Sequence, residues 1–193
     1  MNLKPEPLTT ELAKKKIKEM IKDSSFYLEY GSGGSTLYAS NFCDQIISVE
    51  TDFNFYRELK KMNIKNLNLI YVDIGKTENY GVPKQVEKLF FKNNFPENYC
   101  EKPWKNMKKK NPDLILIDGR FRVASTLYSI LINENDNCNY MFDDYLNRPF
   151  YHAIEKFIDI YEVFENTIFF KKSKKINLIE IEKLIMNYNN DFR

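Results

Sequence analysis

Acidic residues follow nearly every segment of this sequence that is apolar enough to form a buried β-strand. They are Glu29, Glu50, Asp73, Asp118 and the adjacent pair Asp143 and Asp144. A single carboxylate at a strand end is usually a helix cap. Because the carboxyl ends of parallel strands meet at one edge of a sheet, so many of them favour a ligand site, where carboxylates accept hydroxyl groups, hold a cation or move a proton.

The adjacent pair Asp143 and Asp144 needs a counter-charge. Two carboxylates this close repel each other unless a cation, a proton or an arginine balances them. The sequence offers Arg120, Arg122 and Arg148 as such arginines. Magnesium is the competing counter-charge, because it prefers oxygen ligands. The sequence does not decide between them.

Residues 26–40 (FYLEYGSGGSTLYAS) predict a short strand, a glycine loop and the first turn of a helix, which Ser35 and Thr36 are expected to cap. The free N–H groups of such a loop lie at the positive end of a helix and favour a ligand with anionic or hydrogen-bond-accepting groups. The next apolar segment ends in Glu50, 19 positions after Gly31, where a carboxylate can accept both hydroxyls of a ribose.

Three further side chains are candidates for chemistry or substrate binding. His152, the only histidine, can accept a proton near neutral pH, and a solvent-facing histidine in a first helical turn is the alternative. Arg120 and Arg122 can hold an acidic acceptor or a phosphate with their forked guanidinium groups, or else pair with the neighbouring aspartates.

Strands and helices alternate along the chain, which predicts a mostly parallel sheet of about seven strands between helical layers. The expected strands cover residues 26–28, 45–50, 67–72, 113–117, 140–142, 162–165 and 167–171, and the last two are close enough to pair as antiparallel neighbours. The expected helices cover residues 11–22, 35–41, 52–62, 123–132, 151–160 and 178–188, the first capped by Thr9 or Thr10.

Residues 74–112 interrupt this alternation with Gly, Pro, Asn and aromatic residues. A connection this long in a compact domain is usually a lid or a binding loop, and an ordinary crossover helix near residues 84–91 is the alternative. We expect one domain over residues 1–193, with an N-terminal helix within residues 1–25 and a lid insertion at 74–112.

The amino-acid composition indicates which binding partners and which cellular compartment to expect. Lys and Arg (29) nearly balance Asp and Glu (27), so charge gives no argument for a nucleic-acid partner. No stretch approaches the ~20 apolar residues of a membrane span, and the N-terminus lacks the apolar core of a signal peptide. Three cysteines without a CxxC pair are typical of reduced thiols. We therefore expect a cytoplasmic protein that acts on a small molecule.

In this order the motifs resemble those of the class I S-adenosylmethionine-dependent methyltransferases. The shared pattern, over residues 26–170, is ExGSGG, an acid after the second and third strands, DG after the fourth, DDY after the fifth and a terminal hairpin. More closely, GSGGST, DGRFR and FDDYxxRPxYH are similar to a bacterial group of uncharacterised methyltransferase-like proteins. The resemblance implies a three-layer Rossmann-like fold, S-adenosylmethionine as cofactor and methyl transfer to an oxygen of a small molecule.

The resemblance also implies roles for single residues. Glu29 and Gly31 would face the methionine part of the cofactor, Glu50 its ribose and Asp73 its adenine. The cofactor site would further include Ser32, Gly33, Gly34, Ser35, Thr36 and Asp118. The carboxylates of Asp118, Asp143 and Asp144 match the metal ligands of the macrocin-type O-methyltransferases and would share Mg²⁺. The substrate would lie against Arg120, Arg122 and Arg148, with Asp118 and His152 acting in catalysis.

One position departs from the macrocin-type pattern. Arg120 stands where that family has a second aspartate, which acts as base. Either the base has moved, with His152 as the substitute, or the chemistry is absent and the protein is a cofactor-binding module without transferase activity. An NAD-dependent oxidoreductase is disfavoured, because Thr36 replaces the last glycine of the dinucleotide fingerprint and Glu29 would repel a pyrophosphate.

Overall fold

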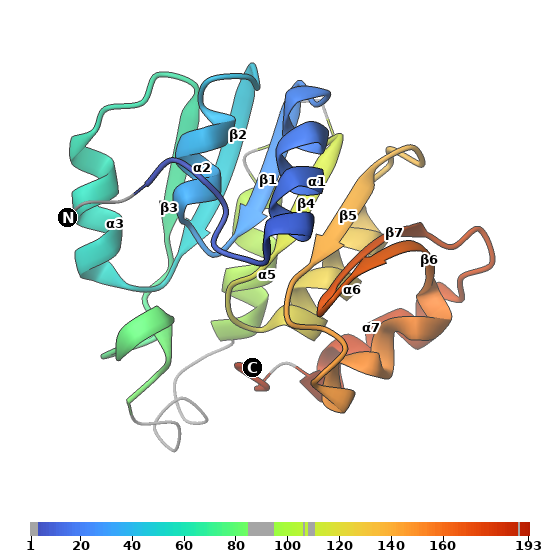
Figure 1. Cartoon of the computed structure of the whole chain (residues 1–193). Coiled ribbons are helices and arrows are strands. Elements are labelled where there is room, and N and C mark those ends of the chain that lie inside the picture. Colours follow the sequence, from blue (N-terminus) through green and yellow to red (C-terminus); the bar gives the residue numbers. More distant parts are fainter. Residues whose placement is uncertain (1–3, 85–94, 106, 108–110, 189) are drawn as a thin grey trace.

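The computed structural model describes residues 4–84, 95–105, 107, 111–188 and 190–193. Its centre is a seven-stranded sheet in the order β3-β2-β1-β4-β5-β7-β6 (Figure 1). The strands are β1 (Phe26–Tyr30), β2 (Gln45–Glu50), β3 (Leu67–Tyr71), β4 (Leu114–Ile117), β5 (Asn139–Phe142), β6 (Ile158–Phe164) and β7 (Thr167–Lys172). The first five are parallel to one another, and β7 is antiparallel to both β5 and β6.

Helices cover both faces of the sheet and complete three layers (Figure 1). They are α1 (Glu11–Lys22), α2 (Gly34–Ala39), α3 (Phe53–Lys61), α5 (Phe95–Lys105), α6 (Arg122–Ile132) and α7 (Leu178–Tyr188), with 3₁₀-helices η1 (Asn79–Gly81) and η2 (Pro149–Phe157). Apolar residues of α1 and α2 pack on one face, and those of α5, α6, η2 and α7 pack on the other.

The central strands are mostly apolar because both of their faces are covered. Side chains alternate between the faces along β1, so that Leu28 and Tyr30 join the larger core cluster and Tyr27 joins the cluster beneath α1 and α2. The same alternation directs Glu29 toward the α2 side, where it is fully buried. A buried carboxylate in a central strand requires hydrogen-bond donors around it.

The parallel order and the terminal hairpin confirm the predicted fold class. The α-helix predicted over residues 151–160 is wrong. Residues Pro149–Phe157 form a 3₁₀-helix, and β6 already begins at Ile158. The residues from Ile158 pair with Lys172 and its neighbours in β7, so long-range strand pairing overrides the helical periodicity. Thr10 precedes α1 as expected, but its side chain makes no capping hydrogen bond.

The predicted lid over residues 74–112, and the alternative helix near residues 84–91, lie partly outside the described residues. Within the described part of this segment, η1 and α5 are the regular elements. The indole Nε1 of Trp104 donates to the hydroxyl of Tyr30 at 2.9 Å, and that hydroxyl donates to the carbonyl of Cys100 at 2.7 Å. These bonds fix α5 against the middle of the sheet.

The described residues include no helix of the length and apolarity that crossing a bilayer requires. Cys43, Cys100 and Cys138 are buried and unpaired. Burial raises the pKa of each thiol, to about 12 for Cys43 and Cys100, so none of them is a reactive thiolate.

Candidate functional site

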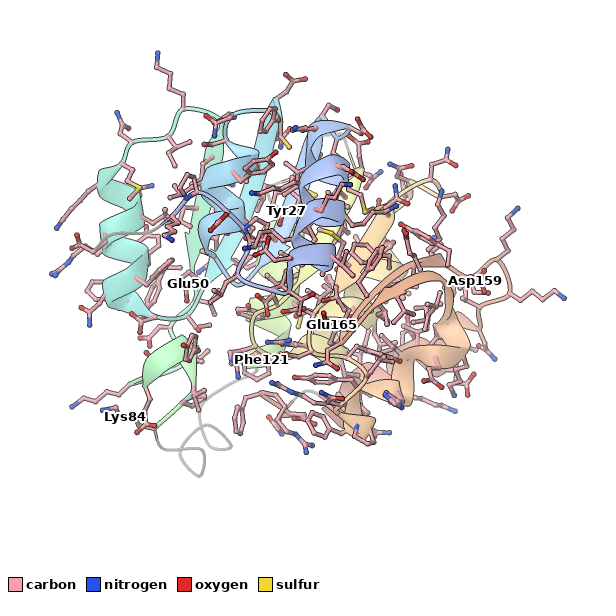
Figure 2. All side chains as sticks on the ribbon, viewed as in Figure 1. Tyr27, Glu50, Lys84, Phe121, Asp159 and Glu165 are labelled. Atoms are coloured by element: carbon pink, nitrogen blue, oxygen red, sulfur yellow. The ribbon has the colours of Figure 1, made fainter. Side chains whose placement is uncertain are left out.

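The loops that follow β1, β2, β4 and β5 meet at the carboxyl edge of the sheet, where Figure 2 shows Glu50 and Phe121. Backbone strain gathers at the same edge. Tyr80, Phe121 and Asp144 have left-handed φ angles of 61°, 53° and 60°. Such conformations cost about 1–3 kcal/mol each and are concentrated at ligand sites. This edge is therefore the candidate site.

The glycine loop touches the loop after β4. Gly31 has a φ of 96°, and a Cβ atom there would lie 2.7 Å from the Cα of Gly119. A side chain at Gly31 would therefore push the two loops apart. Gly33 is different, because a Cβ atom there would meet only the hydroxyl of Ser35, at 3.7 Å. The backbone at Gly33 is thus open to a ligand.

Gly34 is explained by the chain itself. A Cβ atom at this position would overlap the carbonyl oxygens of Lys4 and Glu6. The segment before α1 crosses in front of α2 (Figure 1), and its backbone packs against the first residue of that helix. Of the two adjacent glycines predicted to face the cofactor, one faces open space and the other faces the N-terminal segment.

Glu29 holds the glycine loop in place. Its buried carboxylate accepts hydrogen bonds from the hydroxyls of Ser35, Thr36, Ser48 (3.0 Å) and Tyr27 (3.1 Å). Burial raises the pKa of this carboxyl group, and the hydroxyl donors oppose the rise. Of the two predicted side-chain caps, Thr36 is confirmed, because its hydroxyl oxygen accepts the N–H of the N-cap residue Gly33 at 2.9 Å. Ser35 is wrong as a cap, because its hydroxyl donates to Glu29 instead. The carboxylate therefore sets the shape of the loop from beneath.

Glu50 ends β2 beside this loop. Its Oε1 accepts the backbone N–H groups of Thr51 at 2.7 Å and Asp52 at 2.8 Å. Gly81 of η1 lies against it, because a Cβ atom there would be 3.9 Å from Oε1. Burial raises the pKa of Glu50 to about 7. Only Oε1 has hydrogen-bond donors within the described part of the chain, which leaves Oε2 for a ligand hydroxyl.

An aromatic cluster that sequence reasoning missed lies beside β3. The ring of Tyr71 packs against Phe53 at 5.4 Å and against Tyr56 at 5.3 Å between centroids. Phe53 is exposed, and Asp73, two residues beyond Tyr71, is also exposed and accepts the N–H of Gly75 at 2.8 Å. The aromatic residues at the start of the helix after Glu50 were the available signal for this cluster.

Asp118 and Asp144 are paired with the guanidinium of Arg122, which takes the place of the predicted metal ion. The guanidinium lies 3.0 Å from the carboxylate of Asp118 and 3.7 Å from that of Asp144. It also donates to the carbonyls of Gly119 (3.0 Å), Asp143 (2.7 Å) and Asp118 (3.0 Å). Arg122 is 3% exposed, so this is a buried cation whose three guanidinium nitrogens all bond at the strand ends.

The other two members of the predicted set are also occupied. Arg148 binds the carboxylate of Asp144 at 2.7 Å, and the carboxylate of Asp143 accepts the hydroxyls of Thr9 (3.2 Å) and Thr167. Over the described ranges no three His, Cys, Asp or Glu side chains form a group that could hold a metal ion. The donor set does not fit Mg²⁺ in this arrangement, because arginine supplies the counter-charge.

His152 lies on η2, apart from this ion-pair network. Its Nδ1 is 3.6 Å from a carboxylate oxygen of Glu155, and its ring stacks on Tyr145 at 4.9 Å. Its Nε2 is buried and has no hydrogen-bond partner among the described residues. In the same part of the structure it shares no hydrogen bond or ion pair with Asp118, the other predicted catalytic residue.

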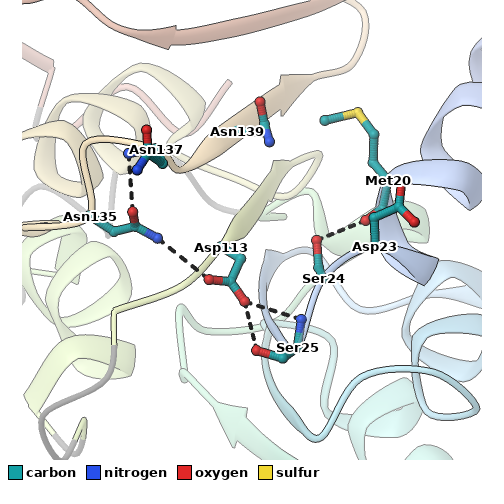
Figure 3. A pocket seen from close by; sticks show the side chains of 8 residues that line it. All are labelled: Met20, Asp23, Ser24, Ser25, Asp113, Asn135, Asn137 and Asn139. Atoms are coloured by element: carbon teal, nitrogen blue, oxygen red, sulfur yellow. Dashed lines mark hydrogen bonds between the residues drawn. The ribbon is translucent and has the colours of Figure 1, made fainter.

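A polar hollow lies at the opposite, amino edge of the sheet (Figure 3). The Asp113 carboxylate in it accepts the N–H and hydroxyl of Ser25 (3.1 and 2.9 Å) and the N–H of Phe26 (2.9 Å). These bonds tie the start of β1 to the start of β4. None of the residues predicted for chemistry lines this hollow, so we assign it a structural role.

Comparison with known proteins identifies chains of similar fold. No protein-family model and no curated protein sequence matches the chain. A methyltransferase-like protein from Silicibacter pomeroyi is 25% identical, with 96% of this chain and 98% of that chain covered and a TM-score of 0.82. The N-methyltransferase NodS from Bradyrhizobium japonicum, solved with S-adenosyl-L-homocysteine, is 7% identical, with 85% and 88% covered and a TM-score of 0.51.

The protein therefore has the fold of the class I S-adenosylmethionine-dependent methyltransferases. Within that superfamily it is similar to a bacterial methyltransferase-like protein over almost the whole length of both chains, which confirms the resemblance seen in the sequence.

Proposed function

We propose that this protein is a methyltransferase that binds S-adenosylmethionine at the carboxyl edge of the sheet and methylates an oxygen of a small molecule. The observation that carries the proposal is the glycine loop, open at Gly33, beside a buried Glu50 whose Oε2 is available. Both features lie at the carboxyl ends of parallel strands, the edge at which open α/β sheets bind their ligands.

The residues present fit this cofactor. Glu50 would accept the ribose hydroxyls through Oε2, and Gly31 to Gly33 would face the amino-acid part. The exposed ring of Phe53, with Asp73 nearby, would hold the adenine. When bound, S-adenosylmethionine supplies an electrophilic methyl group on a sulfonium centre. Glu29 would contribute from beneath by keeping the loop in its binding shape.

Asp118 is the residue best placed to receive the acceptor's proton. It lies one residue before Gly119, which touches the glycine loop, and 37% of its side chain remains exposed to an incoming ligand. Burial of its carboxyl group raises its pKa, Arg122 opposes the rise, and Asp143 adds to it. Transfer itself needs mainly correct positioning of the acceptor oxygen against the methyl group. His152, with Nε2 buried and unpartnered within the described residues, is the second proton acceptor we consider.

A binding module without transferase activity is the second candidate function. It is favoured by Arg120, which stands in place of the base of the macrocin-type enzymes. It is also favoured by Arg122, which forms ion pairs with two of the strand-end carboxylates. For both candidates the buried, unpaired thiols support a reducing compartment such as the cytoplasm, and we propose a small molecule as partner.

Isothermal titration calorimetry with S-adenosylhomocysteine, S-adenosylmethionine and NAD, each with and without Mg²⁺, tests the proposal. We expect saturable binding of the first two, none of NAD, and no effect of Mg²⁺. Binding of NAD alone would overturn it. Incubating the protein and S-adenosylmethionine with a panel of hydroxylated acceptors, and measuring S-adenosylhomocysteine release, then separates the two candidates, because a binding module releases none.

A further inference from the structure

Arg120 is the arginine at the carboxyl edge that has no carboxylate partner among the described residues. Arg122 binds Asp118 and Asp144, and Arg148 binds Asp144. Arg120 is half-buried, and its Nε is fully shielded from solvent without a hydrogen-bond acceptor in the described part of the chain. A shielded donor without an acceptor costs about 1–3 kcal/mol, so this position favours a ligand that supplies one.

The place of Arg120 is fixed by its backbone. It follows Gly119, whose Cα lies against Gly31 of the glycine loop, and its own N–H donates to the hydroxyl of Tyr99 at 3.3 Å. Tyr99 is 1% exposed, so this anchor is rigid. The backbone of Arg120 is therefore held beside the loop that we assign to the cofactor, and the charged groups that act on its guanidinium are Arg122 and Asp118.

The charges around Arg120 limit what it can bind. Burial lowers its pKa, and the like charge of Arg122 lowers it further, so an anion at this position is stabilising. The positive charge is small, however, because Asp118 and Asp144 neutralise Arg122 and Arg148, which leaves the single charge of Arg120. A singly charged anion suits this balance better than a phosphate dianion. A planar carboxylate also matches the Nε and Nη fork.

We propose that Arg120 binds the carboxylate of a ligand at the methyl-transfer site. The inference rests on the proposed function, and two sources share this chemistry: the amino-acid carboxylate of the cofactor and a carboxylate on the acceptor. In either case Arg120 distinguishes carboxylate-bearing ligands from their neutral analogues.

Calorimetry with matched ligands separates the sources. S-adenosylhomocysteine and 5′-methylthioadenosine share the nucleoside and the thioether, but only the first carries a carboxylate. They are titrated into wild type, Arg120→Leu, Arg120→Lys and the control Arg57→Leu, which removes an exposed arginine on α3. If the carboxylate belongs to the cofactor, Arg120→Leu lowers the affinity for S-adenosylhomocysteine roughly 10- to 100-fold and leaves the affinity for 5′-methylthioadenosine unchanged. Arg120→Lys then retains part of the affinity for S-adenosylhomocysteine.

A second pair of probes tests the acceptor. Benzoate and the neutral benzamide are followed by ligand-observed NMR, with and without S-adenosylhomocysteine. If the acceptor is the source, wild type and Arg57→Leu bind benzoate in preference to benzamide, and Arg120→Leu loses the preference. The proposal is overturned if Arg120→Leu behaves as Arg57→Leu with all four ligands, or weakens both nucleosides equally. Failure of wild type to bind either nucleoside counts against the proposed function instead, and the benzoate comparison then decides the role of Arg120.

Discussion

Replacing Glu50 by glutamine should raise the free energy of unfolding and lower the affinity for the cofactor. The change keeps the shape of the side chain and the oxygen that accepts the N–H groups of Thr51 and Asp52, but it removes a buried negative charge. In the folded protein burial raises the pKa of Glu50 from 4.5 to about 7. The ionised carboxylate is therefore a cost to the fold, and a ligand that donates hydroxyl groups to it offsets that cost.

The size of the effect follows from the pKa. Each pKa unit is worth about 1.4 kcal/mol, so the rise corresponds to about 3 kcal/mol as an upper bound. The new amide NH₂ group has no hydrogen-bond acceptor among the described residues, which costs about 1–2 kcal/mol, so a net gain of about 1–2 kcal/mol is expected. For a protein of this size that is a rise in melting temperature of about 2–8 °C.

The effect of Glu50→Gln on the free energy of unfolding depends on pH. An acid whose pKa is higher in the folded than in the unfolded protein destabilises the fold once the pH exceeds its unfolded value, because the unfolded chain then loses the proton more readily. The cost of Glu50 is therefore absent below pH 4.5 and complete above about pH 7. The gain from Glu50→Gln should appear over this window and reach its full size at pH 8.

Urea unfolding of wild type, Glu50→Gln and the control Glu182→Gln at pH 4.5 and pH 8 measures this. The control removes an exposed carboxylate on α7 and should change little. Calorimetry on the same proteins should show S-adenosylhomocysteine weakened by about 1.5–3 kcal/mol in Glu50→Gln alone. A Glu50→Gln protein that is less stable than wild type at pH 8, or whose gain is the same at both pH values, would refute the reasoning.

Three further predictions concern the same edge. Gly33→Val should fold as wild type, because its Cβ meets only Ser35 at 3.7 Å, yet lose S-adenosylhomocysteine binding; Gly34→Ala should instead cost about 1–3 kcal/mol of stability by displacing residues 4–6. Melting curves and calorimetry on both variants check this, and full cofactor affinity in Gly33→Val would place the site elsewhere. Arg122→Leu should cost about 2–4 kcal/mol by removing the buried guanidinium that binds the carboxylate of Asp118 and three backbone carbonyls, while Asp144 keeps Arg148; urea unfolding measures this. Wild type titrated with Mg²⁺ should show no saturable binding, and saturable binding would contradict arginine as the counter-charge.

The fold could be predicted from the sequence because its signals are local. Uninterrupted apolar runs such as Leu114–Ile117 define central strands, and the glycine loop and Glu50 follow such runs directly. The ends of most elements were therefore correct to within a few residues. The exception, Ile158–Phe164, has a helical periodicity in its first residues and becomes a strand only through pairing with β7, a contact that the local pattern does not contain.

The site was less predictable because its contacts join distant elements. The sequence offered three arginines and a cation as counter-charges, and only the packing of α6 against the strand ends selects Arg122. Likewise Gly34 is adjacent to a ligand loop, but its close neighbours are Lys4 and Glu6, some thirty residues earlier in the chain. Sequence spacing identifies which residues reach an edge, and side-chain packing decides which of them remain free.

A crystal structure with S-adenosylhomocysteine tests the central claim most directly. The account predicts the ligand at the carboxyl edge, with its ribose hydroxyls on Oε2 of Glu50 and its backbone contacts at Gly33. Density for the ligand at any other place, or a ribose that Glu50 does not contact, would contradict it.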